Sequence, residues 1–252
     1  MRGPVAIIGI GAFGRLAASS LGEHTEVLAI DAREARLEDL PGGVRRASAE
    51  DLPSCRAVLI ATPVRVIPGV LEQIASLVTP GTLVCDVASV KSAPCSWMNA
   101  ALPEGCHVLG THPLFGPETV REVGLRGQPI ALCPVRIDAT PLAEVREFLA
   151  DALGLEVHAI DAEEHDRQMA LVQAVTHLIG RAASTMELPE LPLGTLAYKR
   201  LLQMKRNTER DAPELYDAIQ RLNPHARDAR HAFLEAIRAL VDDLERLDAR
   251  DE

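Results

Sequence analysis

The sequence lacks the features that mark several large classes of protein. Lysine and arginine never form a block long enough to follow a nucleic-acid backbone, and 26 basic against 36 acidic residues give a net charge of −10. No apolar stretch approaches the length of a membrane span, and the first residues do not have the layout of a signal peptide. We therefore expect a cytoplasmic protein that binds neither nucleic acid nor a membrane.

Cysteine spacing argues against another set of functions. The five cysteines form no Cys-x-x-Cys pair, and their number is odd. Four of them lie in or beside apolar, strand-like runs, where a reduced thiol behaves as a small core residue. Cys95 lies in a more polar stretch near Lys91, but no histidine is adjacent in sequence to serve as its base. The sequence therefore predicts neither disulfides nor a metal site, and a catalytic thiol has little support.

The chain has no internal repeat and no low-complexity segment, and 252 residues with 47% hydrophobic composition suit one large domain or two modest ones. Residues 4–160 alternate short runs rich in Val, Ile, Leu and Cys with helical stretches, which is typical of an α/β fold with a Rossmann-like, mostly parallel sheet. Strands are predicted at residues 4–9, 25–30, 56–61, 82–86, 106–110, 128–133 and 155–159. Helices are predicted at 12–21, 65–78, 93–101 and 140–153, with a short or missing crossover helix after the second strand.

After residue 160 the pattern becomes helical. This predicts a dinucleotide-binding domain at 1–160 and an all-helical, substrate-binding and dimerisation domain at 161–252. Helices are expected at about 161–187 and 193–209, from near Pro213, and after Asn223-Pro224, with Asn223 as N-cap and Pro224 at the first helical position. Apolar residues of the last helix recur every three or four positions: Ala226, Phe233, Ile237, Leu240, Leu244 and Leu247. This stripe fits an intramolecular core or a dimer interface, and the small size of the helical part favours a homodimer.

A glycine-rich turn, Gly9-Ile-Gly11-Ala-Phe-Gly14, follows the predicted strand Val5–Ile8 and opens an alanine-rich helix. In this context G-x-G-x-x-G is a dinucleotide-binding fingerprint, because its glycines allow a tight turn, close approach of a pyrophosphate and close packing of the helix. The motif predicts cofactor contacts from Gly9, Gly11, Ala12, Phe13 and Gly14.

Asp31 ends the second predicted strand, where its carboxylate would accept hydrogen bonds from the adenosine ribose and repel a 2′-phosphate. This favours NAD over NADP as the cofactor. Arg33 keeps NADP open, because an arginine just past the strand could pair with that phosphate. Thr62, directly after the strand at 56–61, is a further candidate cofactor-binding residue.

Residues 111–118, Thr-His-Pro-Leu-Phe-Gly-Pro-Glu, form a shaped turn after the fifth predicted strand. Pro113 and Pro117 fix φ, and Gly116 permits backbone angles that other residues avoid, so the turn presents His112. An imidazole there could accept a hydroxyl proton while a hydride leaves the same carbon. A lone histidine in such a place is more often a structural cap. Together with the fingerprint, it favours a base beside a nicotinamide.

Four blocks in order carry a resemblance over almost the whole chain: Asp86-Val-Ala-Ser-Val-Lys91, His112-Pro-Leu-Phe-Gly-Pro117, Glu164-His-Asp-Arg-Gln-Met-Ala170 and Val175-Thr-His177. The chain resembles the prephenate/arogenate dehydrogenase family. The resemblance implies oxidation by NAD of a cyclohexadienol at the ring carbon that bears the 4-hydroxyl, with loss of the ring carboxylate as CO₂ and aromatisation. Prephenate would give 4-hydroxyphenylpyruvate, a step of tyrosine biosynthesis.

The resemblance also implies roles for single residues. His112 would be the base for the 4-hydroxyl, and Ser89 would hydrogen-bond near that hydroxyl and orient the imidazole. Arg206 would bind the ring carboxylate, for which a guanidinium offers bidentate geometry. His177 would lie in the active site, and Glu118 would shape access to it or pair with an arginine. Arg206 and Glu118 also fit ordinary solvent-exposed charges.

The chain departs from the family pattern at two positions. One residue is inserted near Ala212 relative to the family pattern, and the assignment of Arg206 depends on this insertion. Gly180 stands where some relatives carry a second histidine, so the contacts to the substrate side chain differ from those of these relatives. Lys91 receives no role. We expect neither the fused mutase segment nor the regulatory extension of some relatives, so any inhibition by tyrosine would act at the active site.

Several alternatives remain at this level. The same scaffold would serve arogenate or 4-amino-4-deoxyprephenate, which the sequence does not rank against prephenate. A 2-hydroxy- or 3-hydroxyacid dehydrogenase would need a catalytic lysine, or a histidine with a carboxylate partner on a helix, and the His112 turn fits this poorly. An NAD-sensing Rossmann protein would keep the glycines and Asp31 without needing Ser89, His112, His177 and Arg206 together.

Overall fold

The computed structural model describes residues 3–251, and the chain divides into two compact units, one ending at His165 and the other beginning at Asp166. The boundary falls inside helix α6 (Ala162–Met169). None of the described helices is both long enough and apolar enough to cross a membrane.

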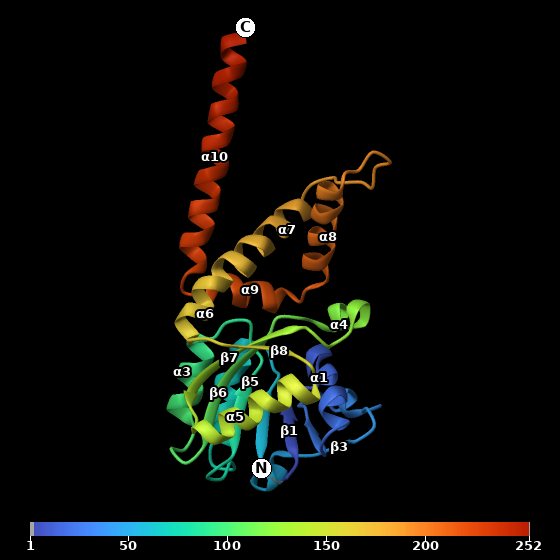
Figure 1. The fold of residues 1–252 in the computed structure, drawn as a ribbon, viewed down its shortest axis with the longest axis vertical. Helices are drawn as coiled ribbons and strands as arrows, with labels where there is room; N and C mark the ends of the chain where they lie inside the picture. The colour runs from blue at the N-terminus through green and yellow to red at the C-terminus, as the bar shows by residue number, and fades with distance from the viewer. Residues whose placement is uncertain (1–2, 252) are drawn as a thin grey trace. The chain divides into compact units, whose positions relative to one another are not determined.

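Unit 1 is built on one sheet in the strand order β3-β2-β1-β4-β5-β6-β7-β8 (Figure 1). Its strands are β1 (Val5–Ile8), β2 (Val27–Ile30), β3 (Val44–Arg46), β4 (Ala57–Ile60), β5 (Leu83–Asp86), β6 (His107–Pro113), β7 (Pro129–Arg136) and β8 (Glu156–Ala159). All neighbouring strands are parallel except β6 and β7, in which His112 lies opposite Ala131. The expected mostly parallel α/β sheet is therefore confirmed.

Strands β1 and β5 are buried along their whole length, as their apolar runs predict for a sheet covered on both faces. The helices of unit 1 are α1 (Ala12–Gly22), α2 (Ile67–Ile74), α3 (Ser92–Ala101), α4 (Pro117–Val123), α5 (Ala139–Glu147) and the first turn of α6. Helix α1 packs on β1 and β2, and α3 packs on β6 and β7.

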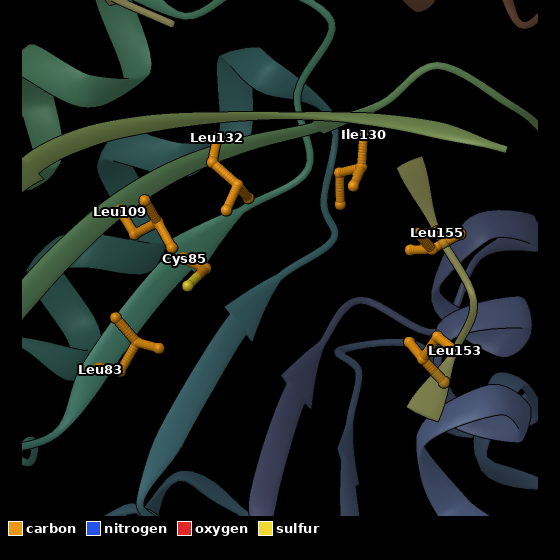
Figure 2. Close-up of a cluster of buried hydrophobic side chains, with 7 residues drawn as sticks. All are labelled: Leu83, Cys85, Leu109, Ile130, Leu132, Leu153 and Leu155. Atoms are coloured by element: carbon orange, nitrogen blue, oxygen red, sulfur yellow. The ribbon is translucent and has the colours of Figure 1, made fainter. Parts of the chain in front are cut away.

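One core cluster joins β5, β6 and β7 to the segment that leads into β8 (Figure 2). Its buried members are Leu83, Cys85, Leu109, Ile130, Leu132, Leu153 and Leu155. Complete burial of one such leucine side chain stabilises the fold by about 1.5–3 kcal/mol. The cluster fixes β6, the strand that carries His112, between two neighbours. All five cysteines are buried free thiols.

Between β2 and β4 the structure adds a strand that the sequence did not predict and confirms that the crossover helix is missing. The short strand β3 was not predicted, because Val44-Arg-Arg46 has one apolar residue and lies at the sheet edge. In place of a crossover helix there are two 3₁₀ turns, Glu34–Leu37 and Ala49–Ser54. A third 3₁₀ turn, Val64–Val66, leads into α2.

Unit 2 consists of helices and contains no strand among its described residues: the rest of α6, then α7 (Thr176–Ser184), α8 (Leu196–Arg210), α9 (Pro213–Arg221) and α10 (Ala226–Asp251). A π-helical turn, Ala170–Val175, joins α6 to α7, and a similar turn, Phe148–Ala152, follows α5 in unit 1. Helices α7 and α8 lie side by side in unit 2 (Figure 1).

Two residues, Gly180 and Asn223, determine how helices of unit 2 pack and begin. A Cβ at Gly180 of α7 would lie 2.6 Å from the side chain of Thr208 on α8, so only glycine allows these helices to come this close. A histidine in that position, as some relatives were expected to carry, would not fit. Helix α10 begins at Ala226, three residues after the predicted N-cap Asn223, whose side chain accepts a hydrogen bond from the His225 amide and donates one to the Asp166 carbonyl.

Candidate active site

The candidate site lies at the carboxyl edge of the sheet in unit 1. Strand order reverses between β1 and β4, and open α/β sheets bind ligands at such a switch point. The glycine-rich turn follows β1, Asp31 follows β2, Thr62 follows β4, and His112 lies near the end of β6. Parallel pairing brings the ends of these strands to one edge.

The glycine-rich turn has the geometry that a dinucleotide fingerprint requires. Gly9 has a φ of +101°, and a Cβ there would lie 2.7 Å from the Ala61 carbonyl oxygen. A Cβ at Gly14 would lie 1.9 Å from the carbonyl oxygen of Gly9, so α1 can approach β1 only through glycine. Above Gly11, by contrast, a Cβ would meet only the Arg36 guanidinium, at 4.0 Å. The turn therefore leaves room on the side where a pyrophosphate would approach the start of α1.

Asp31 is held in its ionised form at the end of β2. Its carboxylate accepts hydrogen bonds from the backbone amides of Ile10 at 2.7 Å and Arg33 at 2.8 Å, and Arg36 lies 3.3 Å away. Burial by itself raises the pKa of Asp31, but the amides of Arg33 and Ile10 together with Arg36 hold the pKa below its usual value of 3.8. The arginine side chain that contacts Asp31 is Arg36, whereas Arg33, named above as a partner for the phosphate of NADP, contacts Asp31 through its backbone amide.

Thr62 supports the same cofactor site. Its methyl carbon lies 3.0 Å from where a Cβ on Gly9 would be, so it borders the glycine-rich turn. Its hydroxyl oxygen is buried and has no hydrogen-bond partner among the described residues. A buried hydroxyl without a partner is costly unless a ligand satisfies it. These residues fit a dinucleotide, whereas the described residues form no cluster suited to a metal ion.

His112 lies near the carboxyl end of the interior strand β6, and it is almost fully buried, with 3% of its surface exposed. Its Nδ1 lies 2.9 Å from Nε2 of His165, which is 1% exposed and comes from the first turn of α6. Burial, His165 and Lys91 together hold the pKa of His112 well below 6.5. The ring is therefore neutral at physiological pH, as a proton acceptor must be.

Lys91 has a structural position that the sequence did not reveal. Its side chain is completely buried, and its ammonium group pairs with the Asp86 carboxylate and donates to the Thr111 carbonyl oxygen at 2.6 Å. Thr111 in turn donates its hydroxyl to the Asp86 backbone carbonyl. The buried pair Lys91–Asp86 thereby fixes the residue that precedes His112.

Ser89 lies half-buried in the loop between β5 and α3. Since β5 and β6 are parallel neighbours, this loop and His112 lie at the same edge of the sheet. No hydrogen bond joins Ser89 to the His112 ring within residues 3–251; the ring contact comes from His165 instead. Glu118 lies in the first turn of α4, where its exposed carboxylate pairs with Arg121 at 2.6 Å.

In unit 2, His177 borders a cavity of about 290 Å³ between α7 and α8, lined by Thr176, His177, Arg200, Gln203, Met204, Asn207, Thr208 and Asp211. His177 Nδ1 lies 3.4 Å from an Asp211 carboxylate oxygen, without hydrogen-bond geometry. Burial outweighs this attraction and lowers the pKa of His177, and burial likewise raises the pKa of Asp211. Asp166 and Gln173, which precede His177 by eleven and four residues, are not among the lining residues.

Arg206 does not line this cavity among the described residues. Its side chain is 41% exposed, and its guanidinium contacts the Glu190 carboxylate at 3.2 Å and the Gln203 side-chain oxygen at 3.1 Å. Arg200 is the arginine of α8 that faces the cavity together with His177. Of the two predicted substrate residues in unit 2, His177 on α7 lines the cavity and Arg206 on α8 does not.

Two residues of the site were missed in the sequence. Arg36 lies five positions after Asp31 in a 3₁₀ turn that no periodicity signals. His165 was quoted within a family block but received no role, although it is the residue that contacts the ring of His112. Its only sequence signal was its position in the first turn of a helix that follows the last strand.

Comparison with known proteins identifies the family. Residues 22–157 match the family described as prephenate dehydrogenase, nucleotide-binding domain. The chain belongs to the prephenate dehydrogenase family. Residues 182–251, within unit 2, match a second family described as TYRAAT1-like, C-terminal domain.

Curated relatives of this prephenate dehydrogenase family member have several names. Arogenate dehydrogenase 2, chloroplastic, of Arabidopsis thaliana is 30% identical over 88% of this chain and 64% of its own length. A 4-amino-4-deoxyprephenate dehydrogenase of Streptomyces pristinaespiralis is 30% identical over 82% of this chain and 71% of its own length. The chain spans only 41% and 38% of two further relatives, from Methanocaldococcus jannaschii and Arabidopsis thaliana.

Solved structures share the fold. A prephenate dehydrogenase from A. aeolicus, in complex with hydroxyphenyl propionate and NAD⁺, superposes with a TM-score of 0.78 at 18% identity, covering 98% of this chain and 92% of that one. The Synechocystis arogenate dehydrogenase gives a TM-score of 0.67 at 21% identity over 98% and 92%. A Mycobacterium tuberculosis 3-hydroxyisobutyrate dehydrogenase gives 0.57 at 15% identity over 87% and 92%.

Proposed function

We propose that the chain catalyses the NAD-dependent oxidative decarboxylation of prephenate to 4-hydroxyphenylpyruvate. The observation that carries the proposal is His112, a buried neutral imidazole at the same sheet edge as a dinucleotide fingerprint. Membership of the prephenate dehydrogenase family supports it. So does the A. aeolicus neighbour, whose complex holds hydroxyphenyl propionate together with NAD⁺.

The cofactor residues in this proposal are the glycine-rich turn with Ala12 and Phe13, and the side chains of Asp31 and Thr62. The backbone around Gly11 would receive the pyrophosphate, and the Asp31 carboxylate would accept hydrogen bonds from the ribose hydroxyls. When bound, NAD supplies the acceptor for the hydride that leaves ring carbon 4. Asp31 favours NAD, whereas Arg36 beside it is the residue through which NADP would be tolerated.

His112 is proposed to move the proton. It takes the proton of the 4-hydroxyl as the C–H bond at the same carbon gives up its electron pair as hydride. The ring carboxylate then leaves as CO₂, and the electrons of its C–C bond enter the ring and complete the aromatic system. The oxygen at carbon 4 becomes phenolate-like and takes the proton back from the imidazolium of His112. Atoms and charge therefore balance without any further acid or base.

The pKa of His112 sets the expected pH dependence. Only the neutral ring accepts a proton, and the site holds this pKa well below 6.5. As the pH falls, kcat/KM should therefore stay level through 6.5 and decline only at lower pH, because kcat/KM reports the free enzyme. A decline centred at or above 6.5 would contradict the assignment of this histidine as the titrating base.

The remaining substrate residues are proposals from the family pattern. Ser89 would hydrogen-bond near the reacting hydroxyl, and Arg206 would bind the ring carboxylate. His177 would contact the substrate, and Glu118 would shape access. The cavity beside His177 and Arg200 supports a polar binding surface in unit 2, and it makes Arg200 a competitor for the role of Arg206.

The test is to mix the purified protein and NAD with prephenate, arogenate or 4-amino-4-deoxyprephenate and to follow the absorbance of NADH. We expect the highest kcat/KM with prephenate. Preference for arogenate or for the 4-amino compound would correct the substrate and keep the reaction class, in line with the names of the Arabidopsis and Streptomyces relatives. Binding of NAD without oxidation of any of the three compounds would favour an NAD-sensing protein.

A further inference from the structure

We propose that His165 is a positioning residue that holds His112 in the tautomer with hydrogen on Nδ1, so that Nε2 is the nitrogen that accepts the substrate proton. The inference rests on the proposed function for its catalytic meaning. Its structural part, the tautomer of a buried ring, can be measured without any substrate.

The contact between the two rings is well defined. His112 Nδ1 and His165 Nε2 are 2.9 Å apart, and the rings meet edge to face with centroids 5.1 Å apart and planes at 69°. Both side chains are buried, with 3% and 1% of their surfaces exposed. A hydrogen bond at this distance between two ring nitrogens needs one donor and one acceptor, so the two tautomers are linked.

Only one of the two arrangements leaves His112 able to act as a base. If His165 donates from Nε2, then Nδ1 of neutral His112 is the acceptor and its Nε2 carries the hydrogen, so neither nitrogen can take a proton from substrate. If His112 donates from Nδ1, its Nε2 carries the lone pair. Catalysis by His112 therefore requires the second arrangement, in which His165 accepts through Nε2.

The site as a whole disfavours a positive charge on His112, and the tautomer with hydrogen on Nδ1 offsets part of that cost. When His112 becomes an imidazolium, its Nδ1–H still points at the lone pair of His165, and a hydrogen bond from a charged donor is roughly twice as strong as a neutral one. No group has to move for this gain. An interaction that strengthens as the proton is transferred lowers the barrier instead of merely improving binding.

The backbone holds His165 in place for this task. Its amide donates to the Asp161 carbonyl at 2.8 Å, and the Asp161 carboxylate caps the same turn by accepting from the Glu163 amide at 2.8 Å. The Ser92 hydroxyl, at the start of α3, donates to the Ala162 carbonyl at 3.4 Å. The first turn of α6 is thus tied to the sheet unit that carries His112.

The charged and titratable groups around His112 in unit 1 come from three elements. His165 faces it from α6, Lys91 from the loop before α3, and Asp86 of β5 pairs with Lys91. Strand β7 presents Ala131 opposite it. Burial, His165 and Lys91 all lower the pKa of His112, so the tautomer of His112, and not its pKa, is the property that isolates the role of His165.

The decisive experiment is nitrogen NMR of the full chain with ¹⁵N-labelled histidine rings, without ligand, at neutral pH. The chain has eight histidines, and the signals of His112 are assigned by their loss in His112→Asn. We expect Nδ1 of His112 to have the shift of a protonated ring nitrogen and Nε2 that of a lone-pair nitrogen. The reverse pattern in the wild type would overturn the proposal.

Variants separate positioning from packing. In His165→Gln the amide oxygen can still accept from Nδ1–H, so the tautomer should persist and kcat should stay within about tenfold of wild type. In His165→Leu the tautomer should change, and kcat should fall by about 10²-fold with the NAD Kd unchanged, which lies within the usual range for a general base. His107→Leu, at the opposite end of β6, is the control. An unchanged tautomer in His165→Leu would contradict the proposal, and should that variant not fold, the wild-type and glutamine spectra still decide.

The proposed function and this inference fail in different ways. A wrong reaction class would appear as wild-type inactivity toward every diacid, whatever the spectrum shows. A wrong tautomer would appear in the spectrum of a fully active enzyme.

Discussion

At the scale of single residues, two arginines of α8 compete to bind the substrate carboxylate. Arg206→Lys keeps the charge and loses the bidentate fork, so if Arg206 is the ligand, KM for the diacid should rise and kcat/KM should fall about tenfold or more, because a hydrogen bond to a charged group contributes about 1.5–3 kcal/mol. The NAD Kd should not change. Steady-state kinetics of this variant is compared with that of Arg200→Lys, the competing arginine, and of Arg210→Lys, the control. A larger effect at Arg200 would move the role to the cavity beside His177.

A second prediction at this scale is that Asp31 determines the preference for NAD over NADP. Removal of its carboxylate in Asp31→Ser leaves Arg36 without its acidic partner and removes the repulsion of a 2′-phosphate. The ratio of kcat/KM for NAD to that for NADP should therefore fall by about tenfold, since a lost hydrogen bond of the ribose contributes roughly 1.4 kcal/mol. Glu38→Ser, an exposed acid in the same loop, is the control. An unchanged ratio would mean that Asp31 does not contact the ribose.

Residues whose role follows from local sequence were the ones that could be predicted. The fingerprint glycines and Asp31 have fixed positions relative to a strand and a helix, and the structure gives them the expected geometry. His165 and Lys91 could not be assigned, because their importance comes from contacts with His112 and Thr111, which lie 53 and 20 positions away. No local pattern encodes such a contact.

At the scale of elements, the packing of α7 against α8 depends on Gly180. In Gly180→Ala the new methyl group would lie 2.6 Å from Thr208 and 3.0 Å from the Met204 carbonyl oxygen, so the helices must separate. We expect a loss of about 1–3 kcal/mol in the free energy of unfolding, typical of overpacking. Gly69→Ala is the matched control, because Gly69 also lies in a helix and has nothing within 4 Å of its Cβ position. It should stabilise by up to about 1 kcal/mol.

Urea unfolding of the two variants measures this difference. Equal midpoints would show that α7 and α8 do not approach each other as closely as described.

Elements with strong periodicity were predicted well, and those without it were not. Seven strands and the main helices follow from apolar runs and helical spacing. Strand β3 is an edge strand of three residues, and the π turns interrupt helices whose sequence continues without a break. Both depend on tertiary packing, which the local pattern does not contain.

At the scale of the whole molecule, the apolar stripe of α10 predicts a second copy of the chain. Leu240, Leu244 and Leu247 are 65%, 61% and 54% exposed, so unit 2 does not bury them in an intramolecular core. We propose that two chains pair through this stripe. Leucines spaced three and four residues apart form one apolar face of a helix, and leaving such a face exposed to water is unfavourable unless a partner covers it.

Leu240→Glu with Leu244→Glu should convert a dimer to a monomer, measured by light scattering after size-exclusion chromatography. Ala239→Glu, exposed on another face of α10, adds the same kind of charge and should leave the dimer intact. A wild type that is monomeric at micromolar concentration would contradict the proposal.

The central claim is that His112 is the base of an NAD-dependent oxidation, and His112→Asn tests it most directly. The measurement is kcat with the preferred diacid and saturating NAD, with the NAD Kd determined on the same preparation. We predict a kcat lower than that of wild type by roughly 10²–10⁴, the usual contribution of a positioned general base, and an NAD Kd that stays the same. Near-normal turnover by His112→Asn would contradict the account.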